Sequence, residues 1–376
     1  MINAPQLERD LLRFICDKLA APVTATSINR DTRLFEDRVV DSLKILELIA
    51  FVQSAIGRKI PDSQIVLANF RSVATISRVF TGVESIIERR PSSRRAARRA
   101  QNTNSAVDQL LARRELELTS EGALRMHGAV AALRDVFDNT VCEWANELGA
   151  TELHFPDEIS LSVLDRAGFL SAFPQKLVST DDAARSPAVC YHHYPTLAGS
   201  IIDRAGGIVT ALGRCYRNEF DLNSTQPAER LREFTMREII TVGDDELVEK
   251  VRRDLMKRVE IWLKQLGLEG YIETATDPFF TDESRGRRLM QQMLPLKYEL
   301  RLRVDRVGRT IAAASFNNHH DHFGEAFGIR LDSGDTASSG CVAFGWERWV
   351  IAFVNQHGPE ERNWPVTVRK DVAASA

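Results

Sequence analysis

Two neighbouring segments of the sequence carry an arginine, carboxylates and an aromatic ring at spacings that suit a nucleotide. The first reads GRCYRNEF and, after a polar loop, the second reads FTMREIITVG. If both are strands, side chains two apart share a face, so Arg217 and Glu219 point together, as do Phe234 and Glu238. The arginine could hold an α-phosphate and neutralise the charge that develops there, and the ring could stack on adenine. An ordinary sheet face with an Arg–Glu pair would have the same pattern.

Two cysteines and one glutamate are candidates for a metal site. Cys190 lies in AVCYHHYPT, Cys341 lies in SGCVAFGW, and Glu238 shares the predicted strand face of Phe234. Two thiolates and a carboxylate are ligands that zinc accepts, and three protein ligands leave one position open for a substrate group. Free cysteines are more often small core residues, however, and nearby histidines are rival ligands. These are His192, His193, His319, His320 and His322, of which we expect the His319–His322 cluster to line a loop.

A serine at a predicted helix start is the third candidate. Asp41, Ser42 and Leu43 precede an apolar stripe, so Ser42 or Asp41 caps the helix and Leu43 begins its buried face. A hydroxyl at a helix N-terminus can host a phosphodiester, because free N–H groups and the helix dipole favour negative charge. A purely structural helix bundle would explain the same residues.

Three segments must position these residues. Residues 1–85 have helical apolar spacing, for example at Leu7, Leu11 and Ile15, and are predicted to form an all-α four-helix bundle. Residues 86–105 contain six arginines with Ser and Pro and few large apolar side chains, which predicts a flexible linker. We interpret its arginines as a solvated tether, with RNA binding or partner docking as the alternative.

Residues 106–376 form the third segment. Residues 106–148 are predicted to be helical, and from Thr151 onward short alternating runs predict strands. Between them lies one amphipathic helix that should end at Gly267, with its apolar face formed by Leu247, Val251, Leu255, Val259, Trp262 and Leu266. Strands in series with few intervening helices favour an α+β fold, with an antiparallel sheet flanked by helices.

The composition is that of an ordinary globular protein. The 376 residues have a net charge of −3, which gives no general reason to expect nucleic-acid binding. The five cysteines are scattered and form no CxxC pair, which argues against a disulfide framework. The sequence has no signal-peptide pattern and no apolar run long enough for a membrane span, so we expect a cytoplasmic protein.

The strand pair resembles motif 2 of class II aminoacyl-tRNA synthetases. The matching residues are Tyr216-Arg217-Asn218-Glu219 and, after the loop, Arg230-Leu231-Arg232-Glu233-Phe234. Gly345-Trp346-Glu347-Arg348 resembles motif 3, and Pro156 is the candidate for the motif 1 proline of the dimer interface. The resemblance implies a homodimer and an ATP site with Mg²⁺. In it, Arg217 holds the α-phosphate, Arg348 holds the far phosphates, and the other contacts are Glu219, Arg230, Leu231, Phe234, Lys297, Ala312, Ala313, Ala314 and Ser315.

A narrower resemblance concerns the metal. The segment REFTMREIITVG is similar to motif 2 of the zinc-dependent seryl-tRNA synthetases of methanogens and of the amino acid:carrier-protein ligases. It implies a zinc ion on Cys190, Glu238 and Cys341 that binds the substrate amine, with Glu238 beside that amine. The Ile311–Ala314 stretch departs from the family's acidic-Ile-Ser-Ser pattern, and Glu299 is a substitute candidate for the magnesium ligand.

Residues 1–85 resemble acyl and peptidyl carrier proteins, in which the serine at the position of Ser42 carries 4′-phosphopantetheine. Together the resemblances imply an enzyme that activates glycine or alanine with ATP and transfers it to a carrier thiol, its own or a separate protein's. A phosphopantetheinyl transferase is then a further partner. The alternatives are a tRNA-aminoacylating enzyme, disfavoured by the absence of a tRNA-binding arm, and a non-catalytic carrier scaffold.

Overall fold

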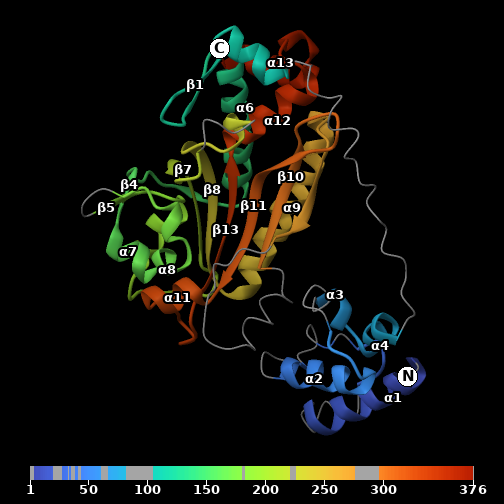
Figure 1. Ribbon diagram of the computed structural model, residues 1–376. Coiled ribbons are helices and arrows are strands. Elements are labelled where there is room, and N and C mark those ends of the chain that lie inside the picture. Colours follow the sequence, from blue (N-terminus) through green and yellow to red (C-terminus); the bar gives the residue numbers. More distant parts are fainter. Residues whose placement is uncertain are drawn as a thin grey trace. The chain divides into compact units, whose positions relative to one another are not determined.

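The computed structural model describes residues 4–19, 28–32, 34, 39–40, 44–60, 67–81, 105–179, 183–220, 226–275 and 296–375. The chain divides into two compact units: of the described residues, those up to 81 and Leu296 belong to the first, and those of 105–275 and 297–375 belong to the second. The first unit is helical and the second combines a mostly antiparallel sheet with helices (Figure 1). The predicted α+β fold class is therefore confirmed. Ser42 and nearly all of the predicted linker lie outside the described residues.

The N-terminal unit has its own hydrophobic core. Its elements are α1 (Ala4–Phe14), the π-helix η1 (Ile15–Leu19), α2 (Lys44–Ile56), α3 (Leu67–Phe70) and α4 (Val73–Thr81). Leu7, Leu11 and Ile15 are fully buried, as their four-residue spacing predicts for one helix face. They pack with Leu48, Val52, Phe70, Val73, Ile76 and Phe80 from the later helices. The periodicity gives each helix an apolar face, and these faces pack together into one core.

A seven-stranded sheet forms the centre of the second unit. Its order is β3-β7-β8-β13-β11-β10-β9, antiparallel throughout except for the β3–β7 pair. The strands are β3 (Thr151–Glu152), β7 (Gly207–Tyr216), β8 (Glu233–Gly243), β9 (Gly270–Thr274), β10 (Lys297–Arg303), β11 (Thr310–His320) and β13 (Ser338–Gly345). The long central strands β8, β11 and β13 are largely buried, because structure covers both of their faces.

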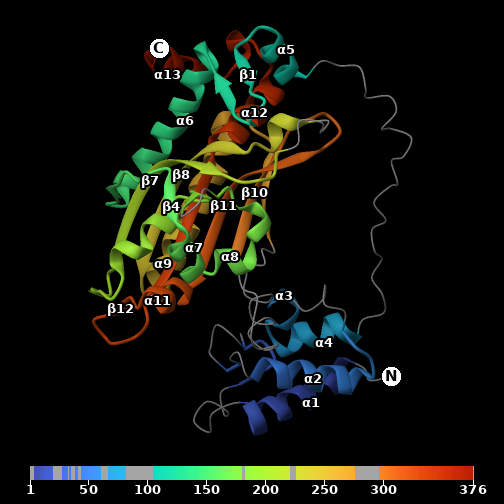
Figure 2. The ribbon, with the colours of Figure 1, turned by 60° about the vertical axis from the view of Figure 1, so that its left-hand side comes forward.

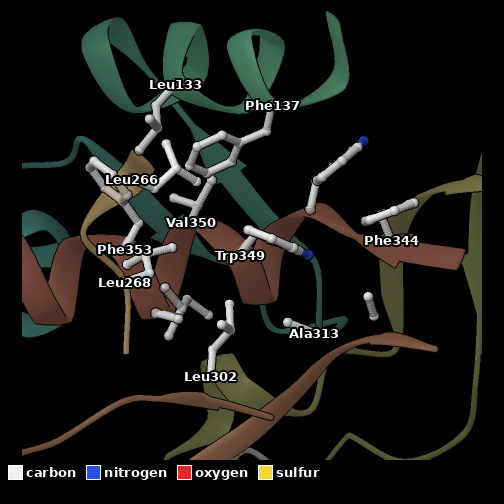
Figure 3. Packing of buried hydrophobic residues seen from close by; sticks show 14 of the residues in the cluster. Leu133, Phe137, Leu266, Leu268, Leu302, Ala313, Phe344, Trp349, Val350 and Phe353 are labelled. Atoms are coloured by element: carbon white, nitrogen blue, oxygen red, sulfur yellow. The ribbon is translucent and has the colours of Figure 1, made fainter. Parts of the chain in front are cut away.

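Three helices cover one face of the sheet: α6 (Gly128–Glu147), α9 (Asp245–Leu266) and α12 (Trp346–His357) (Figures 1 and 2). The amphipathic helix is confirmed as α9. The Asp244 side chain caps its start by accepting from the Leu247 N–H, and Gly267 ends it with φ +62°, a conformation that favours glycine. Between these helices and the sheet lies an aromatic core that includes Phe137, Trp349 and Phe353 (Figure 3).

The prediction of a helix over 106–148 is only partly right. A hairpin of β1 (Leu116–Leu118) and β2 (Leu124–Met126) separates α5 (Ala106–Ala112) from α6. Its turn contains Gly122 at φ +89°, where a Cβ would lie 2.6 Å from the Phe220 ring. The chain must therefore reverse at a glycine, which ends any continuous helix here.

Short elements cover the opposite face of the sheet. They include α7 (Leu161–Arg166), α8 (Phe169–Ala172), the 3₁₀ turns η5 (Cys190–His192) and η6 (Tyr194–Leu197), and α11 (His322–Phe327) (Figure 2). The remaining elements are β4 (Glu158–Ser160), η4 (Pro174–Lys176), β5 (Ala183–Arg185), β6 (Ile201–Ile202), η7 (Pro227–Glu229), β12 (Arg330–Leu331), η8 (Glu361–Asn363) and α13 (Val366–Ser375). Among the helices of the described ranges, none has both the length and the hydrophobicity to cross a bilayer.

Candidate active site

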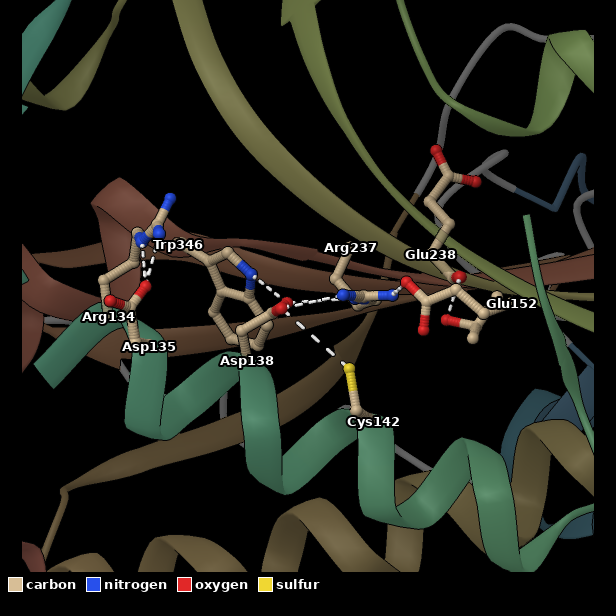
Figure 4. A network of polar contacts seen from close by, with 9 residues as sticks. Arg134, Asp135, Asp138, Cys142, Glu152, Arg237, Glu238 and Trp346 are labelled. Carbon is tan, nitrogen blue, oxygen red and sulfur yellow. Dashed lines mark hydrogen bonds and ion pairs between the residues drawn. The ribbon is translucent and has the colours of Figure 1, made fainter. Parts of the chain in front are cut away.

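A cavity of about 150 Å³ lies on the sheet face opposite α6, α9 and α12. Alternation along β8 turns Phe234, Met236 and Glu238 toward it, while Arg237 points to α6 (Figure 4). Most of the residues predicted for the site line this cavity. They are Cys190, Arg217, Glu219, Leu231, Phe234, Glu238, Lys297, Ala312, Ala313, Ala314, Ser315, Cys341 and Arg348.

Cys190, Glu238 and Cys341 come together in the cavity wall, with one candidate ligand atom from each lying within 4.8 Å of the others. Glu238 and Cys341 share a face of the paired strands β8 and β13, and Cys190 begins η5. The segment before η5 runs close to β7, because Gly213 has no side chain: a Cβ there would lie 3.0 Å from Val189 Cγ2. Three distant parts of the sequence thus meet on one sheet face.

The three groups are buried, and the carboxylate of Glu238 is only partly hydrogen-bonded. The Val189 N–H donates to Glu238 Oε1 at 2.9 Å, but Oε2 has no hydrogen-bond partner among the described residues. Burial raises the pKa of Glu238, and a hydrogen bond with the Cys341 sulfur, together with burial, raises the pKa of the Cys190 thiol. A buried carboxylate oxygen without a partner is costly, and a cation between it and two thiolates would remove that cost.

The histidines lie differently from what we expected. His319 is not in a loop: β11 continues through it, and it is buried in the cavity wall. Burial lowers its pKa to about 3. Its Nε2 lies 3.8 Å from Cys341 Sγ, whereas the other four histidines do not line the cavity. The strand continues because a bulge between Asn318 and His320 accommodates the extra residue.

Two arginines place positive charge in the cavity. Arg217 lies just beyond the end of β7 rather than within it, and its guanidinium lies 5.2 Å from the centre of the Phe234 ring. Arg348, in the first turn of α12, donates to the Ala312 carbonyl at 2.9 Å. Burial and the nearby Arg217 lower the pKa of Arg348, so an anion between the two arginines would relieve their repulsion.

Acidic and basic residues alternate around these arginines. Glu219 pairs with Lys176 at 2.8 Å, and Glu299 pairs with Lys297 at 3.0 Å. The buried Glu347 accepts the Thr235 N–H with both oxygens at 2.9 Å, which joins α12 to β8. Lysines within reach of a phosphate and carboxylates within reach of a divalent cation are the residue types that a nucleotide with Mg²⁺ requires.

Some site residues differ from the sequence-based set. Arg230 follows η7 and does not line the cavity, although its charge acts on Arg348. Residues that the sequence analysis missed also line it, among them Lys176, Tyr191, Asn317 and Phe323. The NNHH run after the Ala-rich strand is the one local signal that could have indicated Asn317 and His319.

Comparison with known proteins identifies the family. The tRNA synthetase class II core domain (G, H, P, S and T) matches residues 208–357. Amino acid–[acyl-carrier-protein] ligase 2 of Bradyrhizobium diazoefficiens is 30% identical over 280 residues, covering 66% of this chain and 83% of the relative. The chain belongs to the amino acid–[acyl-carrier-protein] ligase family. Ligase 1 of the same organism is also 30% identical, over 253 residues, covering 59% of this chain and 76% of that protein.

This ligase is also similar to seryl-tRNA synthetases. The type-2 serine–tRNA ligase of Methanococcus aeolicus is 26% identical over 273 residues, covering 61% of this chain and 51% of that protein. The structure of M. kandleri seryl-tRNA synthetase with A. aeolicus tRNASec matches with a TM-score of 0.63 and 21% identity. It covers 72% of this chain, which spans only 60% of that one. The fold and the enzyme class are therefore those of an amino-acid-activating ligase with a class II synthetase core.

Proposed function

We propose that this ligase activates a small amino acid with ATP and transfers it to a phosphopantetheine thiol of a carrier protein. The observation that carries the proposal is the convergence of Cys190, Glu238 and Cys341 with Arg217 and Arg348 in one cavity of a chain from this family. The first cluster suits an amino acid, and the arginines suit the triphosphate.

The donor set fits zinc. Two thiolates and a carboxylate are zinc ligands, and Glu238 Oε2 has no hydrogen-bond partner among the described residues. When bound, zinc would supply a Lewis-acid position for the substrate's free amine. The chain's own contribution is to hold these three side chains together within a buried pocket, Glu238 through the Val189 N–H.

The cavity wall beside Cys190 supports a small substrate. The Tyr191 ring packs edge-on against Phe169 and Phe323, with centroids 5.6 and 5.8 Å away. These rings contact one another and line the cavity beside the metal ligands, so in this proposal they would exclude a large substrate side chain. Glycine or alanine therefore suits this pocket better than leucine or phenylalanine.

The nucleotide would bind across the cavity mouth. Arg217 and Phe234 are in contact, so an α-phosphate on the guanidinium and an adenine on the ring would be bound side by side. Arg348 would hold the far phosphates. Glu219, Leu231, Lys297 and the Ala312–Ser315 stretch would complete the site, with Glu299 as the candidate ligand for Mg²⁺.

The reaction then needs positioning rather than a protein nucleophile. A carboxylate oxygen of the amino acid attacks the α-phosphorus, and the bond to the pyrophosphate oxygen breaks. The arginines stabilise the negative charge that builds on the phosphoryl oxygens. In the second step the pantetheine sulfur bonds to the carbonyl carbon, AMP leaves, and the thiol proton is released.

Residues 1–85 are, in this proposal, the carrier domain, with Ser42 as the phosphopantetheine site. The support from the described residues is a helical unit with its own core. We further propose a cytoplasmic homodimer that contacts its partner near the exposed Pro156, which sedimentation of the wild type and of Pro156→Glu would test.

Pyrophosphate exchange tests the activation step. The protein is incubated with ATP, labelled pyrophosphate and a panel of amino acids that includes glycine, alanine, serine and leucine. Exchange with glycine or alanine and about one zinc per chain, lost in Cys341→Ala, would support the proposal. Exchange with none of the amino acids would overturn it.

Intact mass spectrometry tests the transfer step. After treatment with a phosphopantetheinyl transferase, ATP and amino acid, the chain should gain the arm and then one hydroxylamine-labile aminoacyl unit. Ser42→Ala should gain neither while keeping exchange activity. Loading of only a separate carrier would show that the N-terminal unit has another role, and charging of tRNA instead would favour the synthetase alternative.

A further inference from the structure

A row of buried polar side chains extends from Cys341. His319 Nε2 lies 3.8 Å from Cys341 Sγ, and His319 Nδ1 lies 3.2 Å from the Tyr194 hydroxyl. The Ser339 hydroxyl lies 3.5 Å from the same Nδ1. All four side chains are buried, with Tyr194 fully so. Neither the nucleotide site nor the metal cluster explains why these groups are arranged in a row.

The backbone is distorted to place His319 in this row. The β11–β13 register shifts between Asn318 and His320, and His320 has φ +47°, which is uncommon for a residue other than glycine. Asp245 holds the distortion: its Oδ1 lies 2.8 Å from His320 Nδ1 and accepts from Asn318 Nδ2 at 3.3 Å. Bulges of this kind redirect a side chain next to an active site.

The chemistry of these groups determines which atom donates and which accepts in each hydrogen bond of the row. A neutral imidazole has one N–H donor and one acceptor nitrogen. A cysteine that binds a metal is a thiolate and cannot donate, so His319 Nε2 must donate to it. Nδ1 is then the acceptor, and the Tyr194 O–H is its donor. Asn317 Nδ2 supplies a second N–H to Cys341 Sγ, at 3.3 Å.

We propose that His319 is a positioning residue, which orients Cys341 and donates an N–H to its thiolate, with Tyr194 fixing the tautomer. With Asn317, this donation withdraws charge from the sulfur, so a metal ion on Cys341 keeps more of its affinity for the substrate amine. Separately, loss of a group that orients a metal ligand typically lowers the affinity for the metal by about 10–100-fold. The inference rests on the proposed metal site.

Cobalt spectroscopy tests it. Metal-free protein is titrated with Co²⁺ alone, and the sulfur-to-cobalt charge-transfer band and the affinity are measured. His319→Phe keeps an aromatic ring of similar size but has no donor, so the band should move to lower energy and the affinity should fall about 10–100-fold. His319→Gln, which can donate an N–H, should restore part of both, and Tyr194→Phe should cause a smaller shift in the same direction.

The control is His322→Gln, a nearby histidine outside the cavity, which should match the parent. An unchanged band and an affinity within twofold of the parent in His319→Phe would overturn the positioning role. If that variant does not fold, an unchanged band in both His319→Gln and Tyr194→Phe does the same. A parent protein without cysteine-bound cobalt would instead refute the metal site, and the inference with it.

Discussion

Arg237 and Glu238 are neighbours in β8, yet they occupy opposite faces of the sheet and opposite electrostatic situations (Figure 4). Arg237, only 3% exposed, donates to both oxygens of Asp138 at 2.9 and 2.7 Å and to Glu152 at 2.6 Å. Asp138 also accepts from Trp346 Nε1 at 2.8 Å. Glu238, only 1% exposed, keeps one carboxylate oxygen without a partner among the described residues.

The difference separates a structural charge from a functional one. On the helix-covered face Arg237 is paired with the largely buried Asp138 and the exposed Glu152, and this network ties β8 to α6. On the cavity face Glu238 is held by one N–H and leaves the rest of its capacity for a ligand. A buried, partly satisfied charge is destabilising by itself, so we expect it where binding compensates for it.

Removing Arg237 should have the largest effect on stability. Arg237→Met leaves Asp138 buried without its cation and should cost about 3–5 kcal/mol in the free energy of unfolding. Urea unfolding followed by tryptophan fluorescence measures it. The matched control is Arg253→Met, which breaks an exposed ion pair with Glu249 and should cost about 1 kcal/mol or less. Equal costs in the two variants would contradict the structural role.

Removing Arg348 should affect catalysis and not the fold. Arg348→Ala loses a charge-assisted phosphate contact and should lower pyrophosphate exchange by about 100-fold or more, with a similar loss for Arg217→Ala. Arg214→Ala is the control, because Arg214 is exposed on β7 and pairs with Glu233. Exchange within a factor of two of the parent would refute the phosphate roles.

Glu238→Gln should have the opposite effect on stability to Arg237→Met. The variant should lose zinc, yet in chelator-treated protein it should be at least as stable as the parent at pH 7. Burial raises the folded-state pKa of Glu238 above its usual 4.5, so its contribution to stability is present below pH 4.5 and is lost as pH rises. We therefore expect metal-free Glu238→Gln to exceed the metal-free parent in free energy of unfolding by about 1 kcal/mol or more, and this difference should grow from pH 5 to pH 7.5. A clear loss of stability in Glu238→Gln would make Glu238 a structural residue.

Substitution of His357, which lies far from Arg237 and Glu238 in the sequence, should have the smallest effect on stability. Burial lowers its pKa, although its Nε2 donates to the Leu266 carbonyl at 2.9 Å. Since the folded-state pKa lies below 6.5, this contribution is present above pH 6.5 and is lost as pH falls below it. His357→Gln keeps a hydrogen-bond donor. It should reduce the change in the free energy of unfolding between pH 7.5 and pH 5.5 by about 1 kcal/mol or less. An identical pH dependence would rule out this role.

Local signals predicted several parts of this molecule. The apolar face of α9 and its end at Gly267 followed from local signals, and the two-residue period of β8 placed Phe234 and Glu238 on one face. Periodicity is a property of consecutive residues, so it can be read without the fold. The hairpin before α6 was missed because its strands are three residues long, which is too short for a periodic signal.

Residues whose role depends on contacts with distant parts of the sequence could not be predicted from local patterns. Lys176 lines the site because η4 lies near the end of β7, where it pairs with Glu219. His319 enters the cavity through a bulge that Asp245 stabilises from α9. Nothing in the residues around Lys176 or His319 specifies those partners.

The sequence by itself determined the class of chemistry. Residue types with fixed valence and charge, such as the thiols of Cys190 and Cys341 and the guanidinium groups of Arg217 and Arg348, limit what a site can bind wherever the chain places them. The tertiary structure alone decided which buried charges are satisfied. Arg237 and Glu238 are consecutive, and only the packing of α6 on one face and of η5 on the other gives one ion complete partners and leaves the other incomplete. Hydrogen bonds and ion pairs require contact within a few ångströms, and contact between distant segments exists only after folding.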